Sequence, residues 1–184
     1  MSDESVKTKW KISDLVYIAL FAVLIAVCSW IAIPAAVPFT LQTFAVFLAV
    51  DLLGGKRGSL AVLVYLLLGT VGIPVFAGFG AGIGFLFGPT GGYLLGFLLS
   101  ALIYWLVTAG LGAKLPVRIC AMALGLLVCY AFGTAWFMIV YARTSGPIRL
   151  AAALSWCVFP FLLPDAVKLA LAVTLSGRLS RHIQ

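Results

Sequence analysis

The sequence predicts an all-α integral membrane protein, a bundle of six transmembrane helices that forms a single domain over residues 1–184. Apolar and aromatic residues make up 64% of the 184-residue chain, charged residues make up 9%, and the mean hydropathy is +1.21. A chain this short cannot hide so much apolar surface from water by folding, so lipid must cover part of it. Backbone groups in hydrocarbon need internal partners, and the apolar runs lack the alternation of barrel strands, so we expect helices.

Short connections separate the expected helices from one another. Ser13 and Asp14 are suitable residues to cap the first helix. The apolar run that follows them is about 19 residues long, which is enough to cross a bilayer, and no small-residue cleavage site follows it. We therefore expect a permanent first helix and not a cleaved signal peptide. The predicted spans are residues 13–33, 38–54, 58–71, 91–113, 117–141 and 148–177.

The cations are distributed unevenly between the two sides of the predicted bundle. With a cytoplasmic N-terminus, the outer side holds Arg143 and Arg149, and Lys168 lies inside a span. The inner side then holds nine cations: Lys7, Lys9, Lys11, Lys56, Arg57, Lys114, Arg118, Arg178 and Arg181. Positive charge favours the cytoplasmic side, so we expect both termini to be cytoplasmic. This distribution also explains the net charge of +7 without a nucleic acid partner.

The outer connection at residues 72–92 is unusually rich in glycine. It holds eight glycines, yet it also carries apolar side chains such as Phe76, Phe79 and Phe85. The glycines make a continuous helix unfavourable, and irregular backbone at membrane depth is tolerated where it packs on protein or lines a cavity. Long loops of this kind are usually lids or binding loops. We expect this segment to cover a site.

Several classes of chemistry have no motif in the sequence. The segment Gly54-Gly55-Lys56-Arg57 lacks the spacing of an ATP-binding loop, and the glycine run does not fit a dinucleotide-binding pattern. No catalytic triad and no pair of catalytic carboxylates is visible, so we do not expect an enzyme. The four cysteines have no CxxC spacing, which indicates neither a disulfide framework nor a metal site.

Asp165 and Lys168 are the strongest candidates for a binding site. Both lie in the last apolar span, and their i, i+3 spacing places them on one helix face, where they can pair. Ionised groups within a membrane are costly and by default mark a pathway or a ligand, although an ion pair that fixes helix packing is the alternative. Pro160 and Pro164 predict a kink or broken turn just before Asp165. Asp51, near the inner connection, is expected to be interfacial and structural.

Other polar and small residues in the spans are ambiguous on their own. Gln42 could bind a ligand or bond to another helix, and Tyr93 is more often an interface anchor than a ligand group. The first span contains Ala19, Ala22 and Ala26, of which the last two form a small-xxx-small pair that permits close helix approach.

Residues 37–97 closely resemble the BioY family, and Pro164-Asp165-Ala166-Val167-Lys168 fits the same family. The motifs that carry the resemblance are TLQ, GIPVFAG, GPTGGY and the final P-D-x-x-K. BioY proteins are the biotin-binding S components of energy-coupling factor (ECF) transporters. The resemblance implies a six-helix fold in the cell membrane of a prokaryote. It also implies biotin as the transported ligand, with no cofactor, and docking to a transmembrane T component and two ATPase subunits.

The resemblance also assigns roles to individual residues. It places the pocket carboxylate and lysine at Asp165 and Lys168, and the docking alanines at Ala22 and Ala26, with Ala19 beside them. Some family members carry a polar residue in the glycine-rich loop, and the equivalent position here is near Gly80, beside Phe79. A polar contact from the loop would then come from backbone groups or Thr90. With Gln42 and Tyr93, these residues form the expected substrate site.

The residues leave several functions open. Asp165 could accept hydrogen bonds from the ureido N–H groups of biotin while Lys168 donates to the ureido oxygen, or Lys168 could bind the carboxylate; we prefer the first. An S component for another vitamin, such as thiamine or riboflavin, would have the same fold. A stand-alone secondary transporter with Asp165 as a proton site would show an inverted repeat, which is not visible. A structural scaffold would leave Asp165 and Lys168 unexplained.

Overall fold

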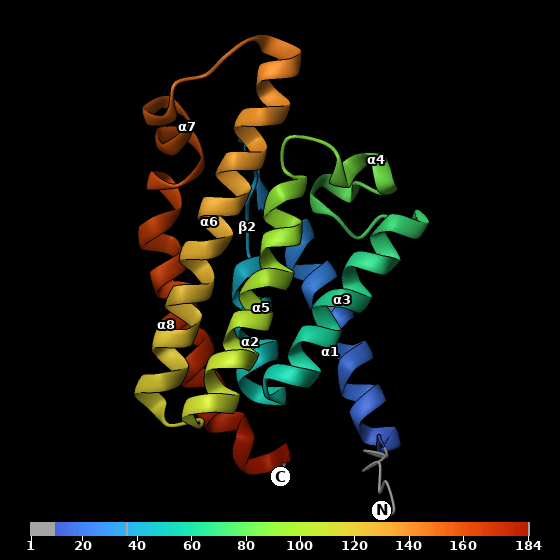
Figure 1. The fold of residues 1–184 in the computed structure, drawn as a ribbon. Helices are drawn as coiled ribbons and strands as arrows, with labels where there is room; N and C mark the ends of the chain where they lie inside the picture. The colour runs from blue at the N-terminus through green and yellow to red at the C-terminus, as the bar shows by residue number, and fades with distance from the viewer. Residues whose placement is uncertain (1–9, 36, 184) are drawn as a thin grey trace, which may run out of the picture.

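The computed structural model describes residues 10–35 and 37–183, with side chains to residue 180. Lys7, Lys9 and the side chain of Arg181, three of the predicted inner cations, lie outside the described part. The molecule is all-α apart from one short ribbon, and its long helices run side by side (Figure 1). The elements are α1 (Ile12–Trp30), β1 (Ala32–Ile33), β2 (Phe39–Thr40), α2 (Gln42–Leu53), α3 (Gly55–Val71), η1 (Ala77–Phe79), α4 (Ile83–Leu86), α5 (Gly91–Leu111), α6 (Leu115–Ser145), α7 (Leu150–Cys157) and α8 (Phe159–Ile183).

Four helical stretches of the described chain are long and apolar enough to cross a membrane. They are α1, α5, α6 and the continuous stretch Leu150–Ser180, which contains α7 and most of α8. The predicted second and third spans correspond to α2 and α3, which are shorter than the helical stretches that correspond to the other four spans. The second span begins later than predicted, because Phe39 and Thr40 pair with Ala32 and Ile33 as antiparallel strands before α2 starts at Gln42.

The last predicted span is broken, but not at the predicted position. Val158, with φ −126° and ψ −56°, separates α7 from α8. Pro160 follows in the first turn of α8, where a missing N–H costs little. Pro164 lies inside the helix, so the turn just before Asp165 stays helical. The break therefore lies about two turns before the carboxylate.

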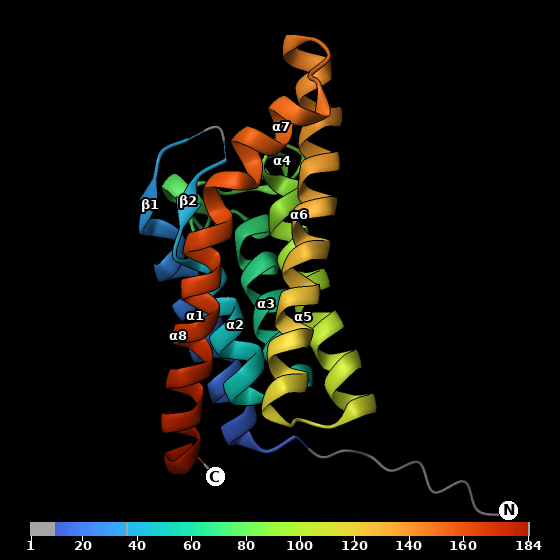
Figure 2. The ribbon, with the colours of Figure 1, turned by 90° about the vertical axis from the view of Figure 1, so that its left-hand side faces the viewer.

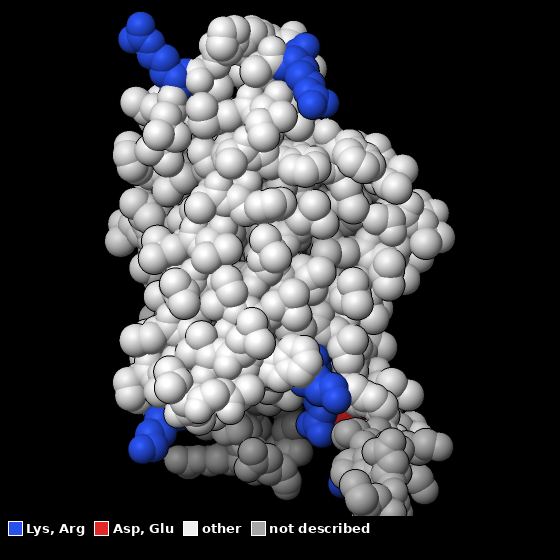
Figure 3. Space-filling view, in the orientation of Figure 1, with Lys and Arg blue, Asp and Glu red and all other residues white. Residues whose placement is uncertain are grey.

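Helix α2 forms the centre of the bundle. Most of its side chains are buried, and it packs against α1, α3, α5 and α8. The outer helices expose many large apolar side chains, among them Leu20, Val71 and Leu163. On the face drawn in Figure 3, the lysines and arginines lie at the two ends and the broad band between them carries no charge. This surface is typical of a protein surrounded by lipid.

The two ends of the bundle differ in charge. The start of α1, the α2–α3 and α5–α6 connections and the end of α8 lie at one end, which we call the basic end (Figures 1 and 2). The glycine-rich segment 72–92 and the α6–α7 connection lie at the other end, which we call the glycine end. Arg143 and Arg149 flank that α6–α7 connection.

The glycine-rich segment is folded, although its composition suggested an irregular loop. It contains η1 and the single turn α4, and an isolated bridge joins Phe76 to Gly80. Phe76 is fully buried, and a Cβ at Gly69 would lie 2.0 Å from its ring, so this ring needs the glycine beneath it. The prediction that the segment packs on the rest of the protein is confirmed for Phe76, whereas three other apolar residues of the segment are largely exposed: Phe79, Ile83 and Phe87.

Candidate ligand-binding site

A cavity lies between the α5–α6 hairpin and the α2–α8 pair, beneath the glycine-rich segment. Its lining combines apolar side chains with the two charged residues predicted from the sequence. The lining residues are Val37, Pro38, Thr40, Gln42, Thr43, Ala77, Phe85, Thr90, Tyr93, Leu94, Phe97, Leu126, Cys129, Tyr130, Cys157, Phe161, Asp165 and Lys168. An apolar enclosure with a few convergent polar groups is the usual form of a small-molecule site.

Asp165 and Lys168 form a buried ion pair in this cavity. The Lys168 Nζ lies 2.8 Å from Asp165 Oδ1, and Lys168 and Asp165 are 5% and 2% exposed. The predicted pairing on one face of a helix is therefore confirmed. Burying two charges is expensive unless further hydrogen bonds satisfy them, so their other contacts decide what the pair can do.

The carboxylate has a second partner that the sequence did not indicate. Tyr130 of α6 donates its hydroxyl to Asp165 Oδ2 at 2.6 Å. Each carboxylate oxygen thus accepts one protein hydrogen bond, whereas an ionised carboxylate has about four acceptor positions. Asp165 keeps the capacity to accept from a ligand.

The ammonium of Lys168 is held by the short strand before α2. It donates to the backbone oxygen of Thr40 at 2.7 Å and lies 4.1 Å from the centre of the Phe39 ring. The hydrogen bond joins residues 128 positions apart in the chain. Sequence reasoning did not find it, because a backbone acceptor carries no side-chain signature.

Gln42 and Tyr93 line the cavity as predicted. Gln42 donates from Nε2 to the Tyr65 hydroxyl at 2.8 Å, which leaves its amide oxygen and one N–H for other partners. The Tyr93 hydroxyl is 2.8 Å from Thr134 Oγ1, so it is buried and hydrogen-bonded within the α5–α6 hairpin. The interpretation of Tyr93 as an interface anchor does not hold in this fold, since the residue is 7% exposed and faces the cavity.

The glycine-rich segment contributes fewer residues to the cavity than expected. Thr90 lines it, together with Ala77 and Phe85. Phe79 does not: the residue is 64% exposed, and its ring stacks on Trp30, with ring centres 5.3 Å apart. Gly80 does not line the cavity either, because the Phe85 ring occupies the space where a Cβ at Gly80 would project.

The three alanines of α1 do not share one surface. Ala22 and Ala26 are 1% and 4% exposed and belong to the protein's own core, whereas Ala19 is exposed. The expectation that Ala22 and Ala26 meet a docking partner is corrected here: the close approach that their small side chains permit occurs inside this chain. Ala19 lies on the outward face with Leu20 and Val23.

The described residues include no group of three or more His, Cys, Asp or Glu side chains able to hold a metal ion. The donors of the site are instead a carboxylate, an ammonium, a phenol, hydroxyls and an amide. Such a set can both donate hydrogen bonds to and accept them from a neutral polar head group, while the apolar walls enclose the rest of the ligand.

Comparison with known proteins agrees with this architecture. The chain is 42% identical over 170 residues to a probable biotin transporter BioY of Pyrococcus horikoshii, covering 92% of this chain and 97% of that protein. It is 40% identical to the biotin transporter BioY of Thermotoga maritima, covering 91% and 96% respectively. The fold is similar to the crystal structure of an S component for biotin from an ECF-type ABC transporter, with a TM-score of 0.81, 25% identity and coverage of 98% of this chain and 95% of that one.

These relatives are transporters. The apolar outer surface of the bundle is therefore that of a multi-pass protein of the cell membrane. The model of the BioY family matches residues 3–184, which is nearly the whole chain. The chain belongs to the BioY family.

Proposed function

We propose that this chain is the biotin-binding S component of an ECF-type vitamin uptake transporter. It captures biotin at the outer face of the membrane, and a T component with two ATPase subunits drives import. The observation that carries the proposal is the buried Asp165–Lys168 pair, satisfied by Tyr130 and Thr40, in a cavity under the glycine-rich segment. The names of the relatives supply the choice of vitamin.

The cavity suits the chemistry of biotin. The ureido head of biotin has two N–H donors and one carbonyl acceptor, and the bicyclic body is apolar. Asp165 retains acceptor positions for the ureido N–H groups, and Gln42, Thr90 and Lys168 offer donors for the carbonyl. The valerate carboxylate is charged, so it remains nearer the outer water beneath the glycine-rich segment, which acts as the lid.

The proposed orientation has the basic end in the cytoplasm. The described cations Lys11, Lys56, Arg57, Lys114, Arg118 and Arg178 belong to segments at that end, and Arg143 and Arg149 flank the connection at the other. Positive-inside bias then places the lid and the cavity entrance outside. The exposed face of α1 around Ala19 is the proposed surface for the T component.

Titration of the purified protein with biotin, thiamine and riboflavin tests the choice of ligand. We expect heat of binding with biotin alone of the three. Uptake of labelled biotin by cells with and without the T component and ATPases tests the partnership. We expect uptake only in cells that contain the T component and the ATPases. Binding of thiamine or riboflavin in place of biotin would be compatible with the S-component fold but would show that biotin is not the ligand. Uptake that is independent of ATPases and driven by a proton gradient would favour a secondary transporter.

A further inference from the structure

The bundle consists of two packed units that meet along a seam. One unit is the α5–α6 hairpin, whose helices pack against each other along their lengths, and the other is built around α2 and α8. Helix α5 also packs on α3, so the two units are joined along that edge of the hairpin as well. Contact between α6 and α8 is slight by comparison. The ligand cavity lies in this seam, since its lining comes from α5 and α6 on one side and from α2 and α8 on the other.

In the described part of the chain, polar side-chain bonds cross the seam at two levels. The first is in the cavity, where Tyr130 of α6 donates to Asp165 of α8. The second lies toward the basic end and consists of Asp51, Tyr104, Arg118 and Ser176, which we call the Arg118 cluster. Tyr130 and Arg118 are separated by 12 residues of α6, a rise of about 18 Å, so the second level is well below the first.

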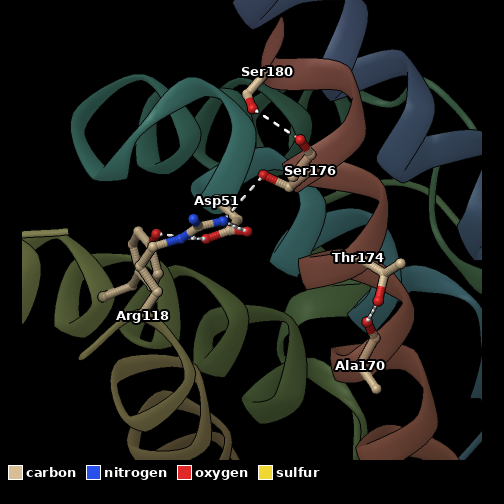
Figure 4. Close-up of polar contacts among 8 residues, drawn as sticks. Asp51, Arg118, Ala170, Thr174, Ser176 and Ser180 are labelled. Carbon is tan, nitrogen blue, oxygen red and sulfur yellow. Dashed lines mark hydrogen bonds and ion pairs between the residues drawn. The ribbon is translucent and has the colours of Figure 1, made fainter. Parts of the chain in front are cut away.

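The Arg118 cluster joins four helices. Arg118 projects from the first turns of α6 and donates through Nε to Asp51 Oδ1 of α2 at 2.6 Å and through Nη2 to Asp51 Oδ2. The same Nη2 donates to Ser176 Oγ of α8 at 3.3 Å, as Figure 4 shows. Tyr104 of α5 donates to Asp51 Oδ1 at 2.8 Å. A two-pronged arginine–carboxylate contact is among the stronger and more directional of hydrogen-bonded pairs.

The side chain of Asp51 is 0% exposed, which agrees with the structural role expected for it, and Asp51 lies near the end of α2 at the basic end. None of the four residues of the cluster lines the ligand cavity. A buried ion pair is weak evidence for stability, since apolar residues of similar volume often serve as well.

We propose that the Arg118 cluster closes the seam beneath the ligand cavity and so seals the cavity from the cytoplasmic side. Above the cluster, the bond that crosses the seam ends on Asp165, the same carboxylate that we propose for the ligand. The seam can therefore rearrange at the level of the cavity while the cluster keeps α6 attached to α2 and α8 below it. The cavity then opens toward the glycine end and not toward the basic end. This inference rests on the proposed function in taking the cavity as the ligand site and the basic end as cytoplasmic.

Cys129 provides a native reporter, because it lines the cavity and is 2% exposed. The other three cysteines are removed by the substitutions Cys28→Ala, Cys120→Ala and Cys157→Ala. A membrane-impermeant methanethiosulfonate is then added, without ligand, to membrane vesicles of each orientation. The rate at which it modifies Cys129 is measured separately for reagent on the basic-end side and on the glycine-end side. Arg118→Gln should raise the rate from the basic-end side by about tenfold or more, because the seam opens locally there, and leave the rate from the glycine end unchanged.

Arg57→Gln is the matched control. Arg57 also pairs with an aspartate at the basic end, Asp14, at 3.0 Å, but this pair joins α3 to α1 away from the seam. It should leave both rates unchanged. Arg118→Lys, which keeps a charge beside Asp51, should restore most of the protection. If Arg118→Gln does not accumulate in membranes, Tyr104→Phe removes one hydrogen bond and no charge, and it should raise the basic-side rate by about fivefold.

An unchanged rate from the basic-end side would overturn the proposal. So would an equal rise from both sides, or an equal rise in Arg57→Gln, since either result indicates general loosening of the bundle. Protection of Cys129 by added biotin is a separate measurement. Its absence would count against biotin as the ligand and would leave the result for the seam unaffected.

Discussion

Lys168 has three N–H donors, and the structure accounts for two of them through Asp165 and the Thr40 oxygen. Its ammonium also lies over the Phe39 ring. The residue is therefore held in place before any ligand arrives. Which end of biotin it serves can be decided by ligand chemistry, because the ureido head and the valerate carboxylate can be changed separately.

If Lys168 donates to the ureido oxygen, biotin with its carboxylate converted to an amide should bind the wild type nearly as well as biotin. Lys168→Met should then weaken the binding of both ligands by a similar amount, about 1.5–3 kcal/mol, since the ureido oxygen loses a charged hydrogen-bond donor. Isothermal titration in detergent measures both effects. The double variant Asp165→Asn/Lys168→Met separates loss of the ion pair from loss of ligand contact.

The carboxylate assignment gives the opposite pattern. The amide would bind the wild type poorly and would be almost indifferent to Lys168→Met. This result would reverse the proposed orientation of the ligand and leave the transporter proposal standing.

At this scale the sequence predicted the charged pair but not its surroundings. Asp165 and Lys168 stood out because ionised residues are rare in apolar spans and their spacing places them on one face. Tyr130 did not stand out, since one tyrosine in an apolar helix has no fixed partner until the packing of α6 against α8 is known. The positions of Phe79 and Gly80 also depend on how the loop folds, which its glycines leave undetermined.

Among the elements, α1 shows most clearly how packing decides the role of a residue. Its apolar composition predicted a span, and α1 extends over Ile12–Trp30. Its composition could not show which alanines face inward. A helix surrounded by lipid is apolar on its outer face as well, so the sequence has no polar face that marks the outside. The structure places Ala22 and Ala26 against the core and Ala19 outside.

Substitutions to tryptophan on α1 should therefore have two different effects. Ala19→Trp should leave biotin binding unchanged while it reduces co-purification of the T component and uptake, because the bulky ring blocks close helix approach at the proposed docking surface. Ala22→Trp should instead lower the stability of the isolated protein by about 1–3 kcal/mol or more, because the ring does not fit a packed core. Thermal unfolding in detergent and affinity co-purification measure the two effects.

Unchanged co-purification and uptake with Ala19→Trp would remove this face of α1 as the docking surface. Full thermal stability of Ala22→Trp would contradict the inward position of that alanine.

Helix boundaries were predictable where proline or glycine ends an apolar run and less so elsewhere. The start of α5 at Gly91 follows the GPTG turn, and the prediction coincides with it. A break near the prolines was predicted, but it lies at Val158, before Pro160, and not just before Asp165. The reason is that a proline restricts the residues before it more than those after it.

For the whole molecule, the charge distribution predicts orientation. Lys114→Cys at the basic end and Phe79→Cys at the glycine end are both at exposed positions, whereas Ser59, also near the basic end of α3, is 4% exposed and would report poorly. In a background without native cysteines, an impermeant thiol reagent added to intact cells should label Phe79→Cys and not Lys114→Cys. Labelling of Lys114→Cys alone would place the lid and the cavity entrance in the cytoplasm and contradict the proposed direction of capture.

The central claim is that the cavity around Asp165 binds biotin, and isothermal titration of the purified protein tests it most directly. The wild type should bind biotin, and Asp165→Asn should weaken binding by about 1.5–3 kcal/mol, since the ligand loses hydrogen bonds to a charged acceptor. Asp14→Asn, which removes the aspartate of the Arg57 pair outside the cavity, should bind as the wild type does. Biotin binding of undiminished strength in a folded Asp165→Asn protein would contradict the account.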